Sequence, residues 1–168
     1  VREKLRESFK ILMSGNETQM KDFVIKFKRE FEHMTPEQIG FPRSINNIEK
    51  YSDTTSIYKK GTPMHVKGAL LYNHLLKTNK VAHKYQRIYN GDKGKFVHLR
   101  KNPWNANVIT FIGSLPKEFD MHKLIDYEQQ FTKSFMDPLR FILEAINWKV
   151  DASEDSQLVE VEDRGDPA

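Results

Sequence analysis

The 168-residue sequence predicts an α+β fold, with helices at both ends around a small antiparallel sheet and a basic irregular segment. Three observations lead to this fold class. Apolar residues recur at helical spacing near both ends of the chain, short alternating runs bounded by Gly, Asn and Asp occupy the middle, and a polar stretch rich in Gly and Pro lies between them. A chain of this length can bury a core, most simply as one domain.

Two helices are predicted at the N-terminal end. Residues 2–14 space their apolar side chains at helical intervals, and Gly15 with Asn16 supplies a stop and a cap. Residues 17–34 carry a stripe of aromatic and aliphatic side chains that includes Phe27. We interpret the two segments as a helical hairpin and the stripe as core.

The next segment alternates between turns and one helix. Residues 35–38 combine a Thr cap with Pro at the first helical position and predict a short helical turn. Residues 39–63 are predicted to be irregular because Gly and Pro interrupt polar sequence. Helical spacing returns over residues 64–77.

Short strands are predicted in the middle of the chain. Residues 85–89 and 95–100 read as strands joined by the turn sequence Asn-Gly-Asp-Lys-Gly at 90–94, which is typical of a hairpin. Residues 108–112 predict a third strand.

The C-terminal part is predicted to be a helix followed by a tail. Residues 120–148 show helical spacing, and Asp137-Pro138 either caps a new helix or kinks a continuing one. Residues 151–168 form an acidic tail that we expect to be disordered. Val1 is not an initiator Met, and we expect the chain to be a piece of a longer polypeptide.

Positive charge is concentrated in one segment. Between Arg43 and Lys101 there are 13 basic and 3 acidic residues, a net of +10, whereas residues 151–168 hold 1 basic and 7 acidic residues. A basic patch of this kind is typical of a protein that binds a phosphate backbone. An ordinary solvated lysine-rich loop is the alternative, and an acidic protein partner would also fit the charge.

The irregular segment offers donors suited to phosphate oxygens. Ser44, Asn46 and Asn47 are short neutral donors, and Gly61 lets the main chain approach a ligand closely. Pro63-Met64 at a helix start directs N–H groups toward an anion. Point charges come from Lys50, Lys59, Lys60 and Lys67.

Several known kinds of site are not predicted. The sequence has no Cys, which excludes disulfides and thiolate metal sites, and its six His residues do not follow a metal-ligand spacing. It contains no Gly-x-Ser-x-Gly elbow and no phosphate-binding Gly-Lys-Ser/Thr loop. No apolar run approaches the ~20 residues that span a bilayer, so no membrane partner is expected.

Four segments resemble a known family, in the same order along the chain. They are SINNIEKYS (44–52), YKKGTPMHVKGALLYN (58–73), NGDKGKFVHLR (90–100) and IDYEQQFTKSFMDPLRFILEAINW (125–148). Together they resemble the C-terminal thumb of B-family replicative DNA polymerases from T-even-like phages, over about residues 1–150. The most specific piece is Pro63, His65, Lys67 and Gly68 followed by Leu71, Tyr72 and Asn73.

The resemblance implies a thumb domain over residues 1–150 that holds primer–template duplex DNA by its backbone behind the polymerase active site. It implies DNA-directed DNA synthesis, a nucleotidyl transfer, by a longer phage enzyme in the cytoplasm of a bacterial host. The palm and fingers of that enzyme would be partners of this chain. Mg²⁺ would belong to the palm, so this chain alone is predicted to be inactive and to hold no cofactor.

Individual roles follow from the matching positions. Ser44, Asn46, Asn47 and Lys50 would approach the primer strand, and Lys59, Lys60, Thr62, His65 and Lys67 would line the adjoining groove wall. His65 is alternatively a structural histidine bonded to the loop. Lys84, Lys93 and Lys95, around the expected hairpin, are weaker candidates for DNA contact and are alternatively solvated.

One short segment imitates a catalytic motif. Residues 51–56, Tyr-Ser-Asp-Thr-Thr-Ser, resemble the family's Tyr-x-Asp-Thr-Asp-Ser, but Thr55 replaces the second Asp. Two-metal phosphoryl transfer needs converging carboxylates, which Asp53 alone does not supply. We therefore expect Asp53 to cap a turn.

The C-terminal tail departs from the family, in which an aromatic or large apolar pair docks on a sliding clamp. Residues 157–161 have no aromatic side chain, so the sliding clamp is an uncertain partner. Two further readings stay open from the sequence. The chain is alternatively a separately encoded subunit of a split polymerase or a stand-alone nucleic-acid-binding module, or else a protein-interaction domain for an acidic partner.

Overall fold

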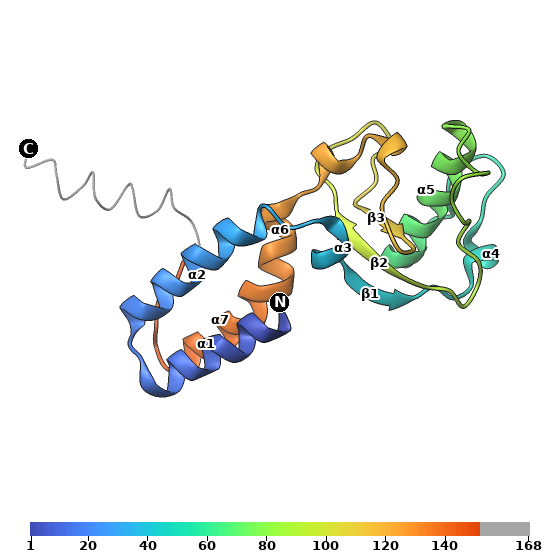
Figure 1. Cartoon of the computed structure of the whole chain (residues 1–168). Coiled ribbons are helices and arrows are strands. Elements are labelled where there is room, and N and C mark those ends of the chain that lie inside the picture. The colour runs from blue at the N-terminus through green and yellow to red at the C-terminus, as the bar shows by residue number, and fades with distance from the viewer. Residues whose placement is uncertain (152–168) are drawn as a thin grey trace, which may run out of the picture. The chain divides into compact units, whose positions relative to one another are not determined.

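A computed structural model describes residues 1–151 of the chain. Helices and a three-stranded antiparallel sheet confirm the α+β class (Figure 1). The chain packs as two compact units, which are described separately. Residues 1–33 and the described residues from 131 onward form what we call the helical unit, and residues 34–130 form the sheet unit.

The helical unit begins with the predicted pair of helices. Helix α1 spans Arg2–Ser14 and α2 spans Glu17–Phe31, three residues shorter than expected at its C-terminal end. A capping box starts α2: the Asn16 side chain accepts from the N–H of Gln19 at 2.9 Å, and the Gln19 side chain accepts from the N–H of Asn16 at 3.0 Å. Asn16 therefore fixes where the second helix starts.

Aromatic rings form the core of the helical unit. Phe27 is buried, and its ring centroid lies 5.9 Å from that of Phe31, 5.6 Å from that of Phe131 and 4.9 Å from that of Phe135. This confirms the prediction that the aromatic stripe of α2 is core. Edge-on and tilted ring pairs at these separations add to the free energy gained by burial.

The segment after Phe131 is helical throughout, with one irregularity. A π-helical turn, η3 (Thr132–Met136), leads directly into α7 (Asp137–Ala145). Pro138 stands in the first turn of α7, where its missing N–H is tolerated. Of the two predictions for Asp137-Pro138, a continuing helix is therefore correct, and the π turn is its irregularity.

The sheet unit contains all three strands. In order across the sheet they are β1 (Phe41–Ser44), β2 (Lys93–His98) and β3 (Val108–Phe111). In β1 and β2, Phe41 is opposite Phe96 and Ser44 is opposite Lys93. Strand β3 confirms the prediction for 108–112, whereas β1 lies in a segment that was predicted to be irregular.

The predicted strand over residues 85–89 is wrong, and with it the predicted hairpin. Its backbone groups bond to side chains of a helix instead of to β2. Asn73 accepts from the N–H of Ile88 at 2.9 Å and donates to its carbonyl at 3.0 Å, and the Tyr72 hydroxyl donates to the Gln86 carbonyl at 2.9 Å. The partner of β2 is β1, about fifty residues earlier in the chain.

Helix α5 (Met64–Thr78) packs on β3, as Figure 1 shows. Gly68 lies at the closest approach, where an added Cβ would stand 2.7 Å from the backbone nitrogen of Thr110. The Thr110 hydroxyl donates to the His65 carbonyl at 2.8 Å and ties the strand to the first turn of α5. Gly68 is thus required by packing.

Two short helices complete this part of the sheet unit. Helix α3 spans Pro36–Ile39, as predicted, and α4 spans Ile48–Tyr51.

The predicted helix over residues 120–148 is wrong in its first part. Two 3₁₀ turns, η1 (Lys117–Phe119) and η2 (His122–Leu124), precede α6, which begins at Tyr127 and ends at Phe131. The reason is that the backbone beyond η2 bonds to the end of β2: the N–H of Arg100 donates to the Leu124 carbonyl at 2.7 Å, and the N–H of Asp126 donates to the His98 carbonyl at 2.8 Å. Sheet contacts override the local helical periodicity here.

Within residues 1–151, no helix is both long and apolar enough to cross a membrane. The tail predicted to be disordered, and the segment considered for clamp binding, lie outside the described residues beyond Asp151.

Candidate nucleic-acid interface

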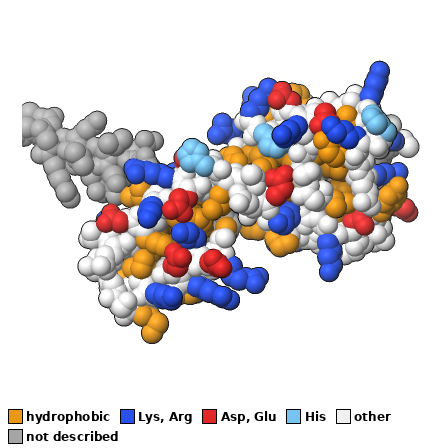
Figure 2. Space-filling view, viewed as in Figure 1, with side chains coloured by type: hydrophobic (Ala, Val, Ile, Leu, Met, Phe, Trp, Pro, Cys, Tyr) orange, Lys and Arg blue, Asp and Glu red, His pale blue; other side chains and the backbone are white. Residues whose placement is uncertain are grey.

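All nine principal candidate residues lie in the sheet unit, and we call them the predicted backbone face. They are Ser44, Asn46, Asn47, Lys50, Lys59, Lys60, Thr62, His65 and Lys67. Figure 2 shows Lys and Arg side chains (blue) projecting from the sheet unit with His side chains (pale blue) among them.

The end of β1 is held against the turn that precedes β2. The N–H of Ile45 donates to the Asp92 carbonyl at 2.8 Å, and the N–H of Gly91 donates to the Ile45 carbonyl at 2.6 Å. Asn47 adopts a left-handed backbone conformation, φ 62°, and its N–H donates to the Asn90 side chain at 2.8 Å. Ile45 is fully buried, and Asn46 and Asn47 beside it are exposed and positioned by this anchoring.

The loop between α4 and α5 closes on itself. Ser52 and Tyr58 form an antiparallel bridge, and the N–H of Lys59 donates to the Tyr51 carbonyl at 2.9 Å. The chain then turns through Lys60 and Gly61, whose φ of 84° suits a glycine. Both lysines are exposed, so the closed loop presents two adjacent ammonium groups to solvent just before α5.

Thr62 has a structural role in this turn. It is buried, and its hydroxyl donates to the Lys59 carbonyl at 2.6 Å. The geometry therefore assigns the Thr62 hydroxyl to holding the turn that carries the two lysines.

Aromatic rings orient two of the lysines. The Nζ of Lys67 stands 5.5 Å from the centroid of the Tyr58 ring, and the Nζ of Lys50 stands 5.4 Å from that of Tyr51. A ring face attracts a cation and limits the side chain's rotamers. These two ammonium groups are thus partly preorganised at the closed loop.

His65 is half-buried at the first turn of α5. Burial, and then the positive charge of the nearby Arg43, lower the pKa of its imidazole below the ordinary value. Its ring forms no hydrogen bond with the described residues, so the alternative of a histidine bonded to the loop does not hold. At neutral pH the ring is a neutral donor and acceptor.

Arg43 is a residue that the sequence reasoning missed. It lies exposed on β1, with its guanidinium carbon 5.6 Å from the Phe96 ring centroid and 6.0 Å from that of Phe41. The local sequence did not reveal β1, so the position of Arg43 across from β2 was not predictable. It adds a positive charge beside His65.

The three weaker candidates differ in whether they have partners within the fold. Lys84 forms an ion pair with Glu118 at 3.0 Å, and the Nζ of Lys95 donates to the Glu37 carbonyl in α3 at 2.6 Å. Lys93 is exposed and opposite Ser44 in the sheet. The structure therefore brings Lys93 close to the predicted backbone face, whereas the other two have partners within the fold.

Asp53 caps a turn, as the sequence predicted. Its carboxylate accepts from the N–H of Thr55 at 3.1 Å and from the hydroxyl of Ser56 at 2.9 Å, and these bonds lower its pKa. Among residues 1–151, no group of three His, Asp or Glu side chains could hold a metal ion. The Asp53 turn does not fit the paired Mg²⁺ ions of phosphoryl transfer.

The charge of the sheet unit is strongly unbalanced. Residues 34–130 hold 15 Lys and Arg against 8 Asp and Glu, a net of +7. Of the Lys and Arg between positions 43 and 101, Lys84 is the one that pairs with a carboxylate within the described part of the chain. Lys95 and Arg43 donate to main-chain carbonyls instead.

Comparison with known proteins gives one informative similarity. The chain is similar to the DNA-directed DNA polymerase of Enterobacteria phage T4, with 29% identity over 150 residues, which cover 86% of this chain and 16% of the polymerase. The chain therefore spans about a sixth of that relative's length. No family model matches the sequence. The similarity supports a region related to a DNA-directed DNA polymerase.

Proposed function

We propose that this chain is the thumb portion of a B-family DNA-directed DNA polymerase from a T-even-like phage, and that it binds primer–template duplex by its sugar–phosphate backbone. The observation that carries the proposal is the set of lysines around the closed loop, exposed at Lys59 and Lys60, and the half-buried Lys67 in the first turn of α5, which lack carboxylate partners among residues 1–151. The similarity to the phage T4 enzyme supports the same assignment.

The composition of the predicted backbone face suits binding without sequence preference. Lysine ammonium groups and asparagine amides contact phosphate oxygens, which carry no sequence information. Direct readout of bases favours bidentate side chains, above all Arg on guanine. A polymerase slides over every sequence it makes, so it requires contacts to phosphate oxygens, which do not depend on the base sequence.

The rest of the proposal concerns the parent enzyme. Its palm and fingers would be partners of this chain, its palm would hold Mg²⁺, and this chain alone would not transfer nucleotides. The enzyme would act in the cytoplasm of a bacterial host during viral DNA replication. A sliding clamp is a further candidate partner, through the tail beyond residue 151.

A pair of matched double variants tests the proposal. Lys60→Ala with Lys67→Ala removes two charges from the predicted backbone face, and Lys10→Ala with Lys26→Ala removes two exposed charges from the helical unit. At about 1 kcal/mol or less per contact, the first pair should weaken duplex binding by roughly five- to thirtyfold. The second pair should leave affinity within about twofold of the wild-type value.

The same variants discriminate further in the complete polymerase. The Lys60/Lys67 pair should shorten the product made per binding event and leave single-nucleotide insertion at saturating DNA nearly unchanged. Loss of insertion with unchanged binding would contradict the assignment. Tighter retention of polyglutamate than of duplex DNA would favour an acidic protein partner instead.

A further inference from the structure

A pocket in the sheet unit lies outside the predicted backbone face. It has a volume of about 260 Å³ and lies between residues 52–57 of the closed loop, helix α5 and Arg87. The residues that matter here are Ser56, Ile57, Leu70, His74, Lys77 and Arg87. None of these six residues is among the candidates for duplex binding.

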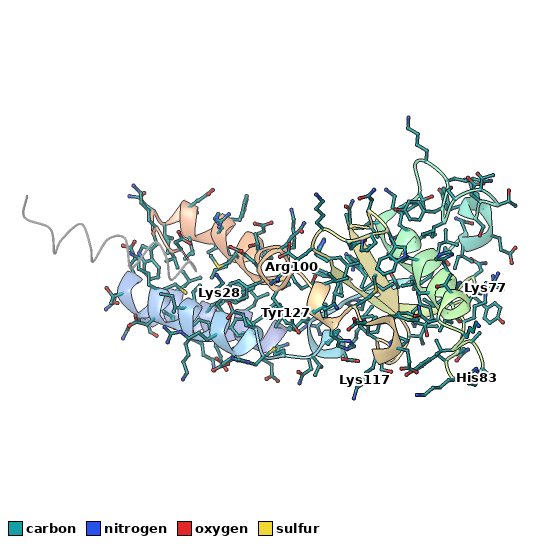
Figure 3. All side chains as sticks on the ribbon, turned by 90° about the horizontal axis from the view of Figure 1, so that it is seen from above. Lys28, Lys77, His83, Arg100, Lys117 and Tyr127 are labelled. Atoms are coloured by element: carbon teal, nitrogen blue, oxygen red, sulfur yellow. The ribbon has the colours of Figure 1, made fainter. Side chains whose placement is uncertain are left out.

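One wall of the pocket is basic. His74 and Lys77 are three residues apart on α5, so they share a face of the helix. Figure 3 labels Lys77 on α5. Arg87 is brought beside them because the bonds of Tyr72 and Asn73 to Gln86 and Ile88 fasten the chain on both sides of Arg87 to the same helix.

The guanidinium of Arg87 is partly preorganised. Its central carbon stands 5.4 Å from the centroid of the Tyr89 ring. This contact with a ring face limits the side chain's rotamers, and the N–H donors of a guanidinium can form a bidentate pair with a phosphate. Arg87, Lys77 and His74 have no ion pair with a carboxylate in the described range 1–151.

The loop brings one negative charge to the pocket. Asp53 lines it as an ionised carboxylate whose two oxygens accept hydrogen bonds within the loop, and the two cationic side chains, Lys77 and Arg87, outnumber it. The Ser56 hydroxyl contributes one of those bonds and also lies 2.9 Å from the Tyr58 carbonyl. Ile57, from the loop, and Leu70, which shares a face of α5 with His74 and Lys77, add apolar surface, so the lining combines basic and apolar side chains.

We propose that this pocket binds the phosphate ester of a nucleotide. The phosphate would lie against Arg87, Lys77 and His74, and its sugar against Ile57 and Leu70. Pockets for drug-sized ligands have volumes of about 300–1,000 Å³. This pocket is slightly smaller than that range, so its size suits one phosphate with its sugar. A free mononucleotide and the 5′-phosphorylated end of a strand present the same chemistry.

The test is a titration of the full 168-residue chain, followed by backbone amide NMR. The ligands are inorganic phosphate, deoxycytidine monophosphate, and a tetranucleotide with and without a 5′-phosphate. We expect amide shifts concentrated at Ser56, Ile57 and Arg87, with tighter binding of the mononucleotide than of inorganic phosphate. If the phosphorylated tetranucleotide binds more tightly than the mononucleotide, the pocket's ligand is a strand end. If the mononucleotide binds more tightly, the ligand is a free nucleotide.

Three variants make the test specific. Arg87→Gln with Lys77→Gln should weaken mononucleotide binding about tenfold or more, and Arg87→Lys should weaken it less, because the charge remains and the bidentate geometry is lost. Lys117→Gln is the matched control, an exposed lysine of the same unit that does not line the pocket and is also labelled in Figure 3. It should bind as the wild type does.

Two results would overturn the proposal. One is a Lys77/Arg87 variant that binds the mononucleotide as well as the Lys117 control does. The other is equal affinity for inorganic phosphate and the mononucleotide, which would show that Ile57 and Leu70 do not contribute to binding. Neither result bears on duplex binding by the Lys60/Lys67 pair, so the two proposals fail separately.

Discussion

The two units of this chain use charge differently. In the helical unit, the described residues hold 11 Lys and Arg against 9 Asp and Glu, a net of +2, and the sheet unit has a net of +7. Helical-unit charges pair with one another: Lys4 lies 3.4 Å from Glu30, and Asp137 lies 3.8 Å from Arg140. In the sheet unit Lys84 and Lys123 also pair with carboxylates, whereas Lys50 and Lys67 lie near tyrosine rings and Lys59 and Lys60 are exposed.

This difference separates charges that serve the fold from charges left for a ligand. Exposed ion pairs contribute little stability, typically under ~1 kcal/mol each, so the helical unit depends on its aromatic core. The sheet unit carries a larger surplus of positive charge on a scaffold built around α5. The following predictions test whether stability and binding divide between the units in this way.

Phe27→Ala should have the largest effect on stability. Removing a buried ring that contacts three others leaves a cavity in the helical unit and should cost about 3–5 kcal/mol. Hydrogen exchange should show loss of protection in α2 with much smaller change in β2. Equal loss in both elements would show that the two units unfold as one.

Gly68→Ala should come next, with its effect in the sheet unit. The new methyl group would meet the backbone of Thr110 where α5 packs on β3, and overpacking of this kind costs about 1–3 kcal/mol. Because the first turn of α5 carries His65 and Lys67, duplex affinity should fall as well. Wild-type affinity and protection of β3 would contradict the importance of this contact.

Tyr72→Phe should cost about 1 kcal/mol, since it removes the hydrogen bond to the Gln86 carbonyl. Burial, with a smaller effect of Tyr85, raises the pKa of Tyr72 to about 12. The folded state therefore keeps this proton when the unfolded state has lost it, and stability falls as pH rises from about 10 to about 12. Urea unfolding at alkaline pH should show a weaker decline in the variant.

His65→Gln should have the smallest effect, visible only as a pH dependence. Burial and Arg43 lower the pKa of His65, so the unfolded state takes up a proton at higher pH than the folded state does. Stability therefore falls as pH drops through the ordinary histidine range. Urea midpoints of the variant between pH 7 and 5 should decline less steeply than those of the wild type.

Local sequence patterns predicted the elements that depend on local interactions. Helices α1, α2 and α5 have apolar stripes and, for α2, a cap at Asn16, all of which lie within the helix itself. Strand β1 contains a proline and pairs with β2 across about fifty residues, so no local pattern identified it. The false strand at 85–89 had the composition of a strand, but its backbone partners are side chains of α5.

The candidate site was predictable in part for the same reason. Charge density and motif resemblance indicated the lysines of the closed loop without knowledge of the fold. The structure was needed to show that Lys84 and Lys95 have partners inside the fold and that Thr62 holds a turn. It was also needed to place Arg43 beside His65, which depends on the pairing of β1 with β2, and Arg87 beside Lys77, which depends on the bonds of the Tyr72 and Asn73 side chains to Gln86 and Ile88.

The most direct test of the central claim is the salt dependence of duplex binding by the 168-residue chain. If the sheet unit neutralises about 5 phosphates, the logarithm of affinity should fall with the logarithm of salt concentration at a slope near −4.5. The Lys60/Lys67 variant should have a shallower slope by about 2, and the Lys10/Lys26 control should keep the wild-type slope. A wild-type slope near zero would contradict the claim that these lysines bind the phosphate backbone.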